Sequence, residues 1–489
     1  MSGLDILLWV IMSVFIANAI LVATIIFFER RNPVSTWAWI FVLSFMPVIG
    51  FIIYLLFGRN AYTQKVFMDK MENDEKTLFD YVENDYELSC EVERQTFSND
   101  GIGLGKEYQN LKDFVTLNIK AGGWLCYNNT VTHFTDGREK FNSLIEDIRS
   151  AKKFIHLQYY IIRWDELGEQ IFIELTKKAS EGVKVRILYD FMGNRHLRKK
   201  FFEPFVLAGG EVEYFYIPMS LSINCRNHRK VVVIDGNIGY IGGFNIGNEY
   251  IGKVKKFGNW RDTHVRFCGE VVNQLQLHFL MDWNHSSKKS KISIDDFYFP
   301  KVDKDYEYLP VQIVCSGPDT QWKNVKYSYF KMITEAEKTI FIETPYFIPE
   351  DDILTALKVA ALSGIDVRII IPGKPDHPFV YWASMSYLGE LLEAGVKCYQ
   401  YETGFIHSKT VFIDGIVASV GTANMDIRSF GINFEINSFI YDSKTIKMLE
   451  KDFFDDLKEC TLITKEIYGK RGKMFKLKES ISRLISPML

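Results

Sequence analysis

Two long apolar runs open the chain and predict a pair of membrane-spanning helices. Residues 6–28 read ILLWVIMSVFIANAILVATIIFF, without a charged side chain, and a second apolar run covers 34–57 after the short polar turn ERRNP. At about 1.5 Å per residue, each run is long enough for a hydrocarbon core of about 30 Å. Pro47 and Gly50 interrupt the second run, which a membrane helix tolerates better than a soluble one. Since no basic region precedes the first run, as it would in a signal peptide, we expect a transmembrane hairpin over residues 1–58.

An acidic segment with spaced apolar positions follows over 59–115 and predicts an amphipathic, solvated linker. A two-pass hairpin leaves the rest of the chain on one side of the membrane. Basic residues lie both in the turn and after the second run, where the chain carries Arg59, Lys65 and Lys70. The positive-inside rule therefore predicts, by a narrow margin, a cytoplasmic body anchored in the cell membrane.

The remaining chain repeats one alternation of apolar strands and helices. AKKFIHLQYYII at 151–162 corresponds to AEKTIFIETPYFI at 336–348, and in both copies a helix end and a capping glycine precede the next buried strand. This order predicts an α/β fold with a largely parallel, buried sheet. We expect two pseudo-symmetric α/β/α repeats, over 116–298 and 299–489, that share one active site.

One short polar pattern occurs near the end of each copy. NHRKVVVIDG at 227–236 and IHSKTVFIDG at 406–415 both read His, any residue, Lys, four residues, Asp, Gly. Side chains alternate between the faces of a strand, so each His and the Lys two residues later point the same way. The candidate catalytic pairs are therefore His228 with Lys230 and His407 with Lys409.

Three further pairs of polar residues accompany the pattern. They are Asp235 and Asp414, Asn245 and Asn424, and Glu249 and Glu435. The aspartates precede glycine, so they are candidates either for catalysis or for a hairpin turn with a supporting ion pair. The amides follow Gly-rich strand ends, where the backbone can approach a ligand, and they can donate to an anionic phosphate oxygen. The glutamates can accept from one imidazole nitrogen and fix the tautomer of the ring.

Two imidazoles, two ammonium groups and two amides suit a displacement at a phosphodiester. Lys and Asn donors can stabilise the charge that spreads over the phosphate oxygens. One His can attack phosphorus while the other protonates the leaving alkoxide and later deprotonates the incoming nucleophile. Because lysines supply the positive charge and none of the usual metal-ligand spacings occurs, we expect neither a metal nor a cofactor.

Composition narrows the class of partner and the compartment. The formal net charge is only −3, which argues against nucleic acid as the main partner. The seven cysteines are scattered and lack a C-x-x-C spacing, which favours a reduced, cytosol-facing body over a disulfide or zinc framework.

The doubled pattern resembles the hallmark of the phospholipase D superfamily, and the chain resembles bacterial cardiolipin synthases over nearly its whole length. The similar segments are ERRNPVSTWAWIFVLSFMPVIGFIIYLLFGRN, NWRDTHVRFCGEVV at 259–272, ANMDIRSFGINFEIN at 423–437 and the ending RLISPML. Gly243 and Thr422 stand where the superfamily often has Ser.

The resemblance implies a membrane phosphatidyltransferase. It would use phosphatidylglycerol and membrane lipids as partners, and would make cardiolipin and glycerol from two phosphatidylglycerol molecules through a phosphohistidine. By analogy His228 is the nucleophile and His407 the acid and base, although the pseudo-symmetry permits the reverse. A phospholipase D-type hydrolase, a nuclease of the same superfamily and a non-catalytic lipid-binding scaffold are the alternatives.

Two basic segments leave alternatives open. From Lys465 onward the chain interleaves apolar residues with Lys470, Arg471, Lys473, Lys476, Lys478 and Arg483. This tail is predicted either to lie on an anionic leaflet or to pack on the body as a solvated terminal helix. NRHLRKKFF at 194–202 is predicted either to guide an anionic headgroup or to be a solvated helix start.

Overall fold

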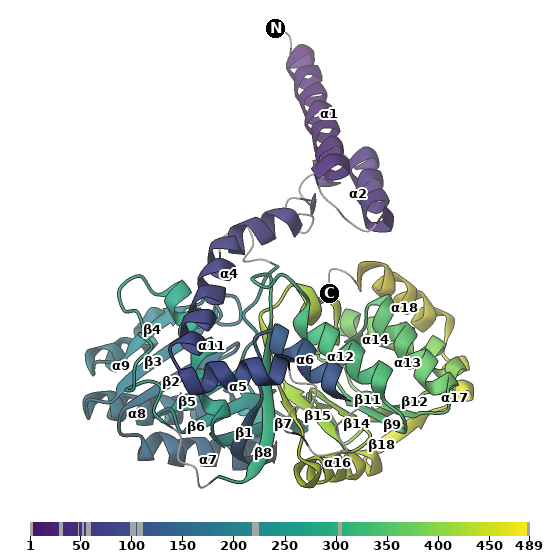
Figure 1. The fold of residues 1–489 in the computed structure, drawn as a ribbon. Helices are drawn as coiled ribbons and strands as arrows, with labels where there is room; N and C mark the ends of the chain where they lie inside the picture. The colour runs from purple at the N-terminus through teal and green to yellow at the C-terminus, as the bar shows by residue number, and fades with distance from the viewer. Residues whose placement is uncertain are drawn as a thin grey trace. The chain divides into compact units, whose positions relative to one another are not determined.

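The computed structural model describes residues 3–28, 33–46, 48–50, 53–54, 60–97, 104, 111–217, 224–301 and 306–486 (Figure 1). The chain divides into two compact units. One consists of Met1–Met71 with Ile217–Cys225, and the other, here called the body, consists of Glu72–Tyr216 with Arg226–Leu489.

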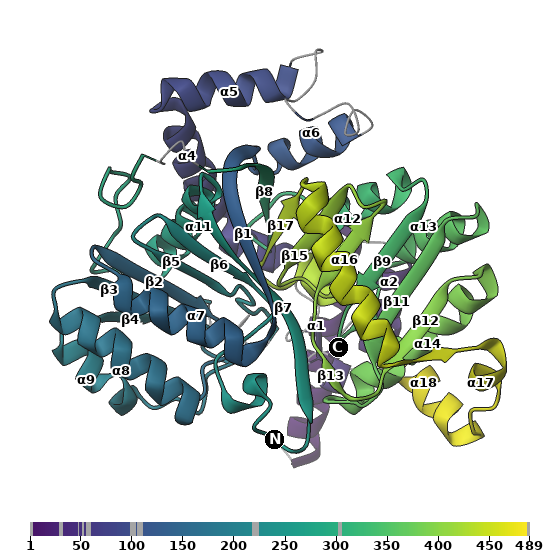
Figure 2. The ribbon, with the colours of Figure 1, turned by 90° about the horizontal axis from the view of Figure 1, so that it is seen from below.

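A mixed sheet of 16 strands runs through the body (Figure 2). Its first half contains β1 (Cys126–Asp136), β2 (Phe154–Tyr159), β3 (Lys184–Tyr189), β4 (Glu211–Tyr214), β5 (Val231–Ile234), β6 (Ile238–Gly242) and β7 (Asn259–Gly269). Its second half contains β8 (Tyr308–Ser316), β9 (Thr339–Glu343), β11 (Asp366–Pro372), β12 (Lys397–Tyr401), β13 (Gly404–Ile406), β14 (Thr410–Ile413), β15 (Val417–Gly421), β17 (Glu435–Ile440) and β18 (Cys460–Ile463). A separate parallel pair joins β10 (Phe347–Ile348) and β16 (Met425–Asp426).

The strand order repeats itself on either side of the antiparallel pair β8 and β1. From the centre outward the second half runs β8-β17-β15-β14-β9-β11-β12-β18, and the first half runs β1-β7-β6-β5-β2-β3-β4. The expected duplication is therefore visible as two halves of one sheet, whose strands follow a matching order on either side of β8 and β1. The expectation of a largely parallel sheet is wrong, however. Only the outer strands β2-β3-β4 and β9-β11-β12 are parallel within each half, while the inner strands are antiparallel.

Helices cover the sheet and enclose a separate apolar core in each half. The first half carries α7 (Gly137–Ser150), α8 (Glu166–Ser180), α9 (Glu203–Leu207) and α11 (Val271–Ser286). The second carries α6 (Lys112–Lys120), α12 (Asn324–Glu335), α13 (Asp351–Leu362), α14 (Pro378–Ala394), α15 (Ile427–Gly431), α16 (Ser443–Lys458), α17 (Lys465–Gly469) and α18 (Lys473–Ile485). The predicted capping glycines are confirmed, since Gly182 after α8 and Gly364 after α13 both adopt positive φ, at 90° and 96°.

The acidic segment is helical, in α4 (Asn60–Glu83) and α5 (Tyr86–Phe97), and from Glu72 onward it belongs to the body. Part of it packs against the rest of the body instead of being solvated. The buried Gln95 side chain donates to the backbone oxygen of Leu125 at 3.0 Å and accepts from its nitrogen at 2.9 Å. Tyr81 stacks on Trp124 with a ring separation of 5.9 Å. These contacts hold α5 and the end of α4 against the first strand.

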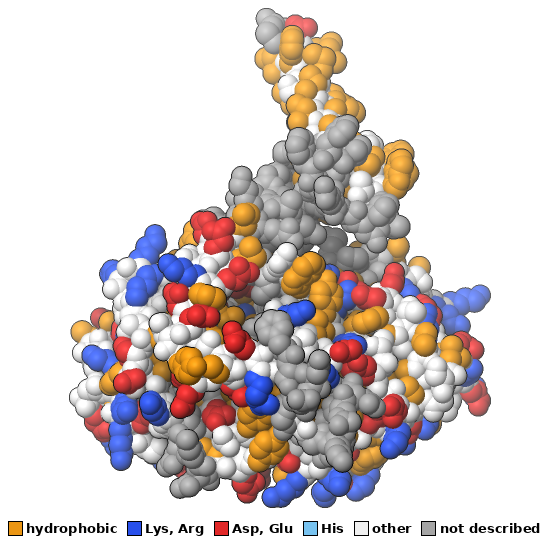
Figure 3. Space-filling view, in the orientation of Figure 1, with side chains coloured by type: hydrophobic (Ala, Val, Ile, Leu, Met, Phe, Trp, Pro, Cys, Tyr) orange, Lys and Arg blue, Asp and Glu red, His pale blue; other side chains and the backbone are white. Residues whose placement is uncertain are grey.

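The N-terminal unit contains α1 (Gly3–Phe28) and α2 (Pro33–Phe45). Among the described residues one helix, Gly3–Ala23, is long and apolar enough to cross a membrane, and its side chains are largely exposed (Figure 3). The expected second span over 34–57 is not confirmed. Its described part holds the 13-residue α2, which ends at Phe45, shortly before Pro47, because proline disfavours the helical conformation of the residue that precedes it. Residues 48–50 and 53–54 are helical as well. Residues 47, 51–52 and 55–57 of that span lie outside the described residues.

The two Asp-Gly turns tie the sheet together at the far end of the His-Lys strands. Asp235 and Asp414 adopt left-handed φ values of 54° and 52°. Each carboxylate accepts three backbone N–H groups, from residues 152–154 and from residues 337–339 respectively, at 2.7–2.9 Å. His228 lies seven residues before Asp235, across β5, so at about 3.3 Å per residue the two side chains are roughly 20 Å apart. These contacts show the two carboxylates supporting the turns, the second of the two alternatives that the sequence left open, and a direct catalytic role stays a prediction.

Candidate active site

Each motif histidine is anchored by its backbone to a strand of the other half. The His228 nitrogen donates to the Phe434 oxygen at 2.9 Å, beside the start of β17, and the His407 nitrogen donates to the Arg261 oxygen at 2.7 Å, within β7. β13, which leads into His407, also pairs in parallel with β7. Both histidines therefore sit where the two halves of the sheet interlock.

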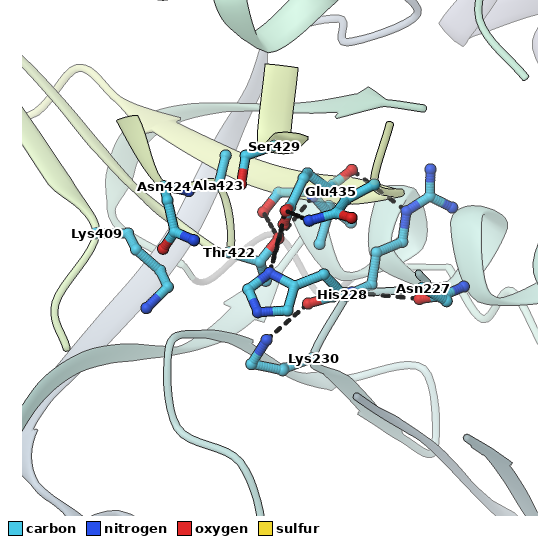
Figure 4. Close-up of polar contacts among 12 residues, drawn as sticks. Asn227, His228, Lys230, Lys409, Thr422, Ala423, Asn424, Ser429 and Glu435 are labelled. Atoms are coloured by element: carbon cyan, nitrogen blue, oxygen red, sulfur yellow. Dashed lines mark hydrogen bonds and ion pairs between the residues drawn. The ribbon is translucent and has the colours of Figure 1, made fainter. Parts of the chain in front are cut away.

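The carboxylates that orient the two rings are exchanged between the halves. His228 Nδ1 lies 2.9 Å from Glu435 Oε2, and His407 Nδ1 lies 2.6 Å from Asp262 Oδ2 (Figure 4 shows the Glu435 pair). Both carboxylate side chains are completely buried. A Nδ1–H held by a carboxylate leaves Nε2 with its lone pair directed away from that carboxylate. Each ring is thereby prepared to act as a base or a nucleophile through Nε2.

Asp262, rather than the predicted Glu249, is the counterpart of Glu435. Gly242 pairs with His264 in the first half and Gly421 pairs with Asn437 in the second, and counting two residues back along β7 and β17 gives Asp262 and Glu435. Glu249 instead accepts from Arg163 Nε at 3.2 Å. The sequence contained a signal for Asp262, since it lies in NWRDTHVRFCGEVV, one of the segments that carry the family resemblance.

The residues that replace the usual serine fit these carboxylates. A Cβ on Gly243 would lie 1.9 Å from Asp262 Oδ1, so glycine leaves the space that the carboxylate occupies. Thr422 instead donates its hydroxyl to Glu435 Oε2 at 2.6 Å. The two copies thus reach the same carboxylate position in different ways.

The two lysines are buried beside the rings. Lys230 Nζ donates to the His228 backbone oxygen at 2.7 Å, and Lys409 Nζ lies 3.0 Å from His407 Nδ1 and 3.2 Å from its Nε2. In Figure 4 the side chains of Lys409 and Asn424 lie to one side of the His228 ring, with Glu435 above the ring and Lys230 below it. Each lysine also lowers the pKa of the histidine in the other motif, so the two motifs share one electrostatic field.

Burial dominates the ionisation of this group. Desolvation lowers the pKa of both His228 and His407 to about 4, and it lowers the pKa of Lys230 to about 7 and of Lys409 to about 8. Burial alone would raise the pKa of Glu435, but His228 and Lys230 hold it below its usual value. Near neutral pH the site therefore holds neutral imidazoles, an ionised Glu435 and partly protonated lysines, whose ammonium form an anion would stabilise.

Aromatic rings that the sequence reasoning missed form walls beside the histidines. Tyr160 packs edge-on against His228 with centroids 4.9 Å apart, and Trp260 lies 5.3 Å from His407. A buried ion pair supports the first motif from behind, because Arg229 contacts Asp282 at 2.7 Å and donates to the Glu435 backbone oxygen at 3.3 Å. Aromatic and Arg residues are too common in this chain for their types alone to have revealed these contacts.

The two predicted amides are held differently. Asn245 accepts from the Ile161 nitrogen at 3.1 Å and donates to the Tyr250 hydroxyl at 3.2 Å, so both ends of its amide have protein partners. Asn424 donates to Asp426 at 3.1 Å, and its buried Oδ1 has no hydrogen-bond partner among the described residues. Asn424 thus retains more free hydrogen-bonding capacity than Asn245.

No cluster suited to a metal ion is found in the described part of the chain, where a group of three or more His, Cys, Asp or Glu side chains was sought. The arrangement instead combines carboxylate-held imidazoles with buried ammonium groups. Such a set can attack a phosphodiester, stabilise the charge on its oxygens and move a proton to or from an alkoxide.

Comparisons with known proteins agree with this chemistry. Residues 144–283 and 329–457 match the family described as "Cardiolipin synthase, PLD-like domain", and residues 7–59 match the family described as "Phospholipase D-nuclease N-terminal". The chain is 50% identical over 479 residues to a cardiolipin synthase of Staphylococcus aureus strain Mu50, covering 97% of this chain and 95% of that protein. It is 46% identical over 490 residues to a cardiolipin synthase of Listeria innocua, covering 99% of this chain and 100% of that protein.

A solved structure shares the fold at much lower identity. Phosphatidylserine synthase of Haemophilus influenzae superposes with a TM-score of 0.62 at 15% sequence identity, covering 79% of this chain and 100% of that one.

The variant Asp262→Asn tests whether Asp262, rather than the predicted Glu249, orients the His407 ring. An amide can present N–H to the ring and stabilise the wrong tautomer of His407, so we expect kcat to fall about 10²–10⁴-fold. The matched variant Glu249→Gln removes a carboxylate that pairs with Arg163, and its kcat should stay close to that of the parent. Steady-state turnover of a phosphodiester lipid measures both, and equal losses would contradict the assignment.

Proposed function

The chain belongs to the cardiolipin synthase family of phospholipase D-like proteins, and on that basis we propose that it transfers a phosphatidyl group from one phosphatidylglycerol to another. The products are cardiolipin and glycerol. The exchange of orienting carboxylates between His228 and His407 is the observation that carries the proposal, because it supplies two prepared imidazoles.

The proposed reaction has two displacements at one phosphorus atom. In the first, Nε2 of His228 attacks phosphorus and the bond from phosphorus to the glycerol oxygen breaks. His407, which takes up a proton as the imidazolium when the anionic phosphate binds, gives its Nε2 proton to that oxygen and becomes neutral. In the second, His407 takes the proton from a hydroxyl of the second phosphatidylglycerol, whose oxygen attacks phosphorus while the N–P bond breaks. The near symmetry of the two motifs makes the reverse assignment equally consistent with the contacts.

The buried cations support the charge changes in these steps. Lys230 and Lys409 lie beside the rings in a desolvated site, where a charge acts more strongly on a phosphate oxygen than it does in water. Asn424 is proposed as a further donor or orienting group for the phosphate, and Asn245 as a support for its surroundings. Glu435 and Asp262 hold the rings in the tautomer that both displacements need.

The substrate also explains the apolar N-terminus. We propose that 6–28 and 34–57 cross the cell membrane as a hairpin, that 59–115 link it to two repeats over 116–298 and 299–489, and that these repeats form one site on the cytoplasmic side. A tether keeps the site near the lipid headgroups and so raises the effective concentration of substrate.

Product analysis tests the proposed transfer. Given phosphatidylglycerol in vesicles, the full chain should form cardiolipin and release one glycerol for each cardiolipin. His228→Ala and His407→Ala should each lower turnover by at least about 10³-fold, because removing one member of a catalytic set disables the whole set. Labelled phosphatidylglycerol should leave an adduct on one histidine that survives base and is lost in acid. Phosphatidic acid as the sole product would replace the transferase by a hydrolase, and plasmid cleavage without lipid turnover would favour a nuclease.

Anion binding should weaken as the pH rises, because the lysines lose their protons. The pKa values of about 7 for Lys230 and about 8 for Lys409 mean that the free site is fully cationic only below neutral pH. Sulfate keeps its charge throughout, so its Kd should increase by up to about tenfold per pH unit for each lysine between pH 7 and 9. Calorimetry measures the Kd of sulfate at each pH. Lys230→Arg, which stays charged, should flatten the dependence, and a Kd unchanged with pH in the parent would contradict it.

Thiol labelling of intact cells tests the membrane arrangement. Cys90 is exposed on α5, and Asn32→Cys places a second thiol in the polar turn between the two apolar runs. A hairpin with a cytoplasmic body predicts that a membrane-impermeant maleimide modifies position 32 in intact spheroplasts and reaches Cys90 only after lysis. Equal access to both positions before lysis would exclude the hairpin.

A further inference from the structure

α18 turns its apolar side outward. Its exposed side chains are Met474, Leu477, Ile481 and Leu484, at 65%, 53%, 47% and 82% of their accessible surface. Their spacing of three and four residues puts them on one face of the helix, here called the outer stripe. An amphipathic helix on a globular body ordinarily buries its apolar face. The exposure of this face therefore indicates that another molecule covers it.

Polar contacts on the opposite face fix this orientation. Glu479 and Ser482 are buried, and Glu479 pairs with Arg471. Arg483 pairs with Glu390 of α14 at 2.6 Å, and Ser486 lies 3.1 Å from the Tyr387 hydroxyl of the same helix. Rotating α18 to bury the outer stripe would break these bonds and leave polar groups against apolar surface. The helix is therefore fixed on the body with the stripe facing outward. Figure 1 shows α18 beside α14.

Positive charge borders the outer stripe. Lys473, Lys476 and Lys478 are exposed on α18, and the Lys478 ammonium lies 4.7 Å from the centre of the Trp382 ring. Apolar side chains flanked by lysines and an aromatic ring match the interface of a bilayer that contains anionic lipids. A second copy of this chain fits less well, because two such faces would bring their lysines together.

The same helix pair borders a small hollow whose lining includes Phe405, two residues before His407. Phe475 of α18 packs against Tyr381 of α14 with ring centroids 6.4 Å apart, and Tyr381 lines this hollow together with Tyr346 and Asp376. The Asp376 carboxylate in turn acts electrostatically on Lys409. A lipid surface lying on the outer stripe would therefore lie against the helix that borders this hollow.

We propose that the outer stripe of α18 is a membrane-docking face, which inserts Met474, Leu477, Ile481 and Leu484 into the headgroup region of an anionic bilayer. The two alternatives for the C-terminal tail are then both realised, since one face of the helix packs on the body and the other meets the lipid. Docking here orients the body on the bilayer, which tethering by the N-terminus alone does not do. The inference rests on the proposed function for the choice of lipid as the occupant.

Photocrosslinking in vesicles tests the docking face without requiring turnover. The full chain is prepared with a benzophenone amino acid at position 484, or at position 173 on α8, where Ile173 is similarly exposed at 61%. In vesicles of phosphatidylglycerol and phosphatidylcholine with tritiated lipid, position 484 should give a lipid adduct and position 173 should not. The adduct yield at 484 should fall about fivefold for each of Lys473→Gln and Lys476→Gln. A protein dimer at 484, or equal lipid adducts at both positions, would overturn the proposal.

Kinetics then separate docking from chemistry. Leu477→Gln with Leu484→Gln should raise the KM for vesicular phosphatidylglycerol at least about tenfold while leaving kcat for a short-chain, soluble phosphatidylglycerol unchanged. The matched control, Ile173→Gln with Met448→Gln, removes exposed apolar residues from α8 and α16 and should change neither. Equal losses on both substrates would contradict docking. Absence of transfer by the parent chain, with the lipid adduct retained, would instead count against the proposed function alone.

Discussion

The exchange of carboxylates between two imidazoles is the constraint on which the rest of this structure depends. Glu435 belongs to the second half of the sheet and holds His228, while Asp262 belongs to the first half and holds His407. Both carboxylates are fully buried, and an ionised group in such a place is strongly destabilising without a partner. Each half alone would leave one buried carboxylate unpaired and one histidine without its orienting group. The duplicated fold and the proposed chemistry are therefore held by the same bonds.

The antiparallel seam of β8 and β1 makes that exchange geometrically possible. It joins two strand sets of matching order, so the ends of β7 and β17 that carry the carboxylates meet the histidines of the opposite half. The motif aspartates serve the same architecture from the other end of the strands, where each binds three backbone N–H groups. In both copies, one strand therefore carries the His-Lys pair at one end and the aspartate that supports the turn at the other.

Desolvation connects the site to the membrane that would supply its substrate. Burial lowers the pKa of both lysines and both histidines, so positive charge in this buried site is costly and an anionic phosphate relieves that cost. A lipid brings that anion together with apolar chains that must stay out of water. The outward apolar stripe of α18 is consistent with the same requirement, since it would hold the body on the bilayer while the lipid chains remain in it.

The sequence by itself determined the features that depend on local order along the chain. Periodicity revealed the apolar first helix, the strand and helix alternation, the glycine caps after α8 and α13, and the paired His228-Lys230 and His407-Lys409, because alternation along a strand fixes which side chains share a face. Only the tertiary structure decided which carboxylate meets which ring, why Asp235 lies far from the chemistry, and which face of α18 is exposed. These are contacts between residues tens to hundreds of positions apart. They depend on how strands pair across the seam, and no local pattern encodes that pairing.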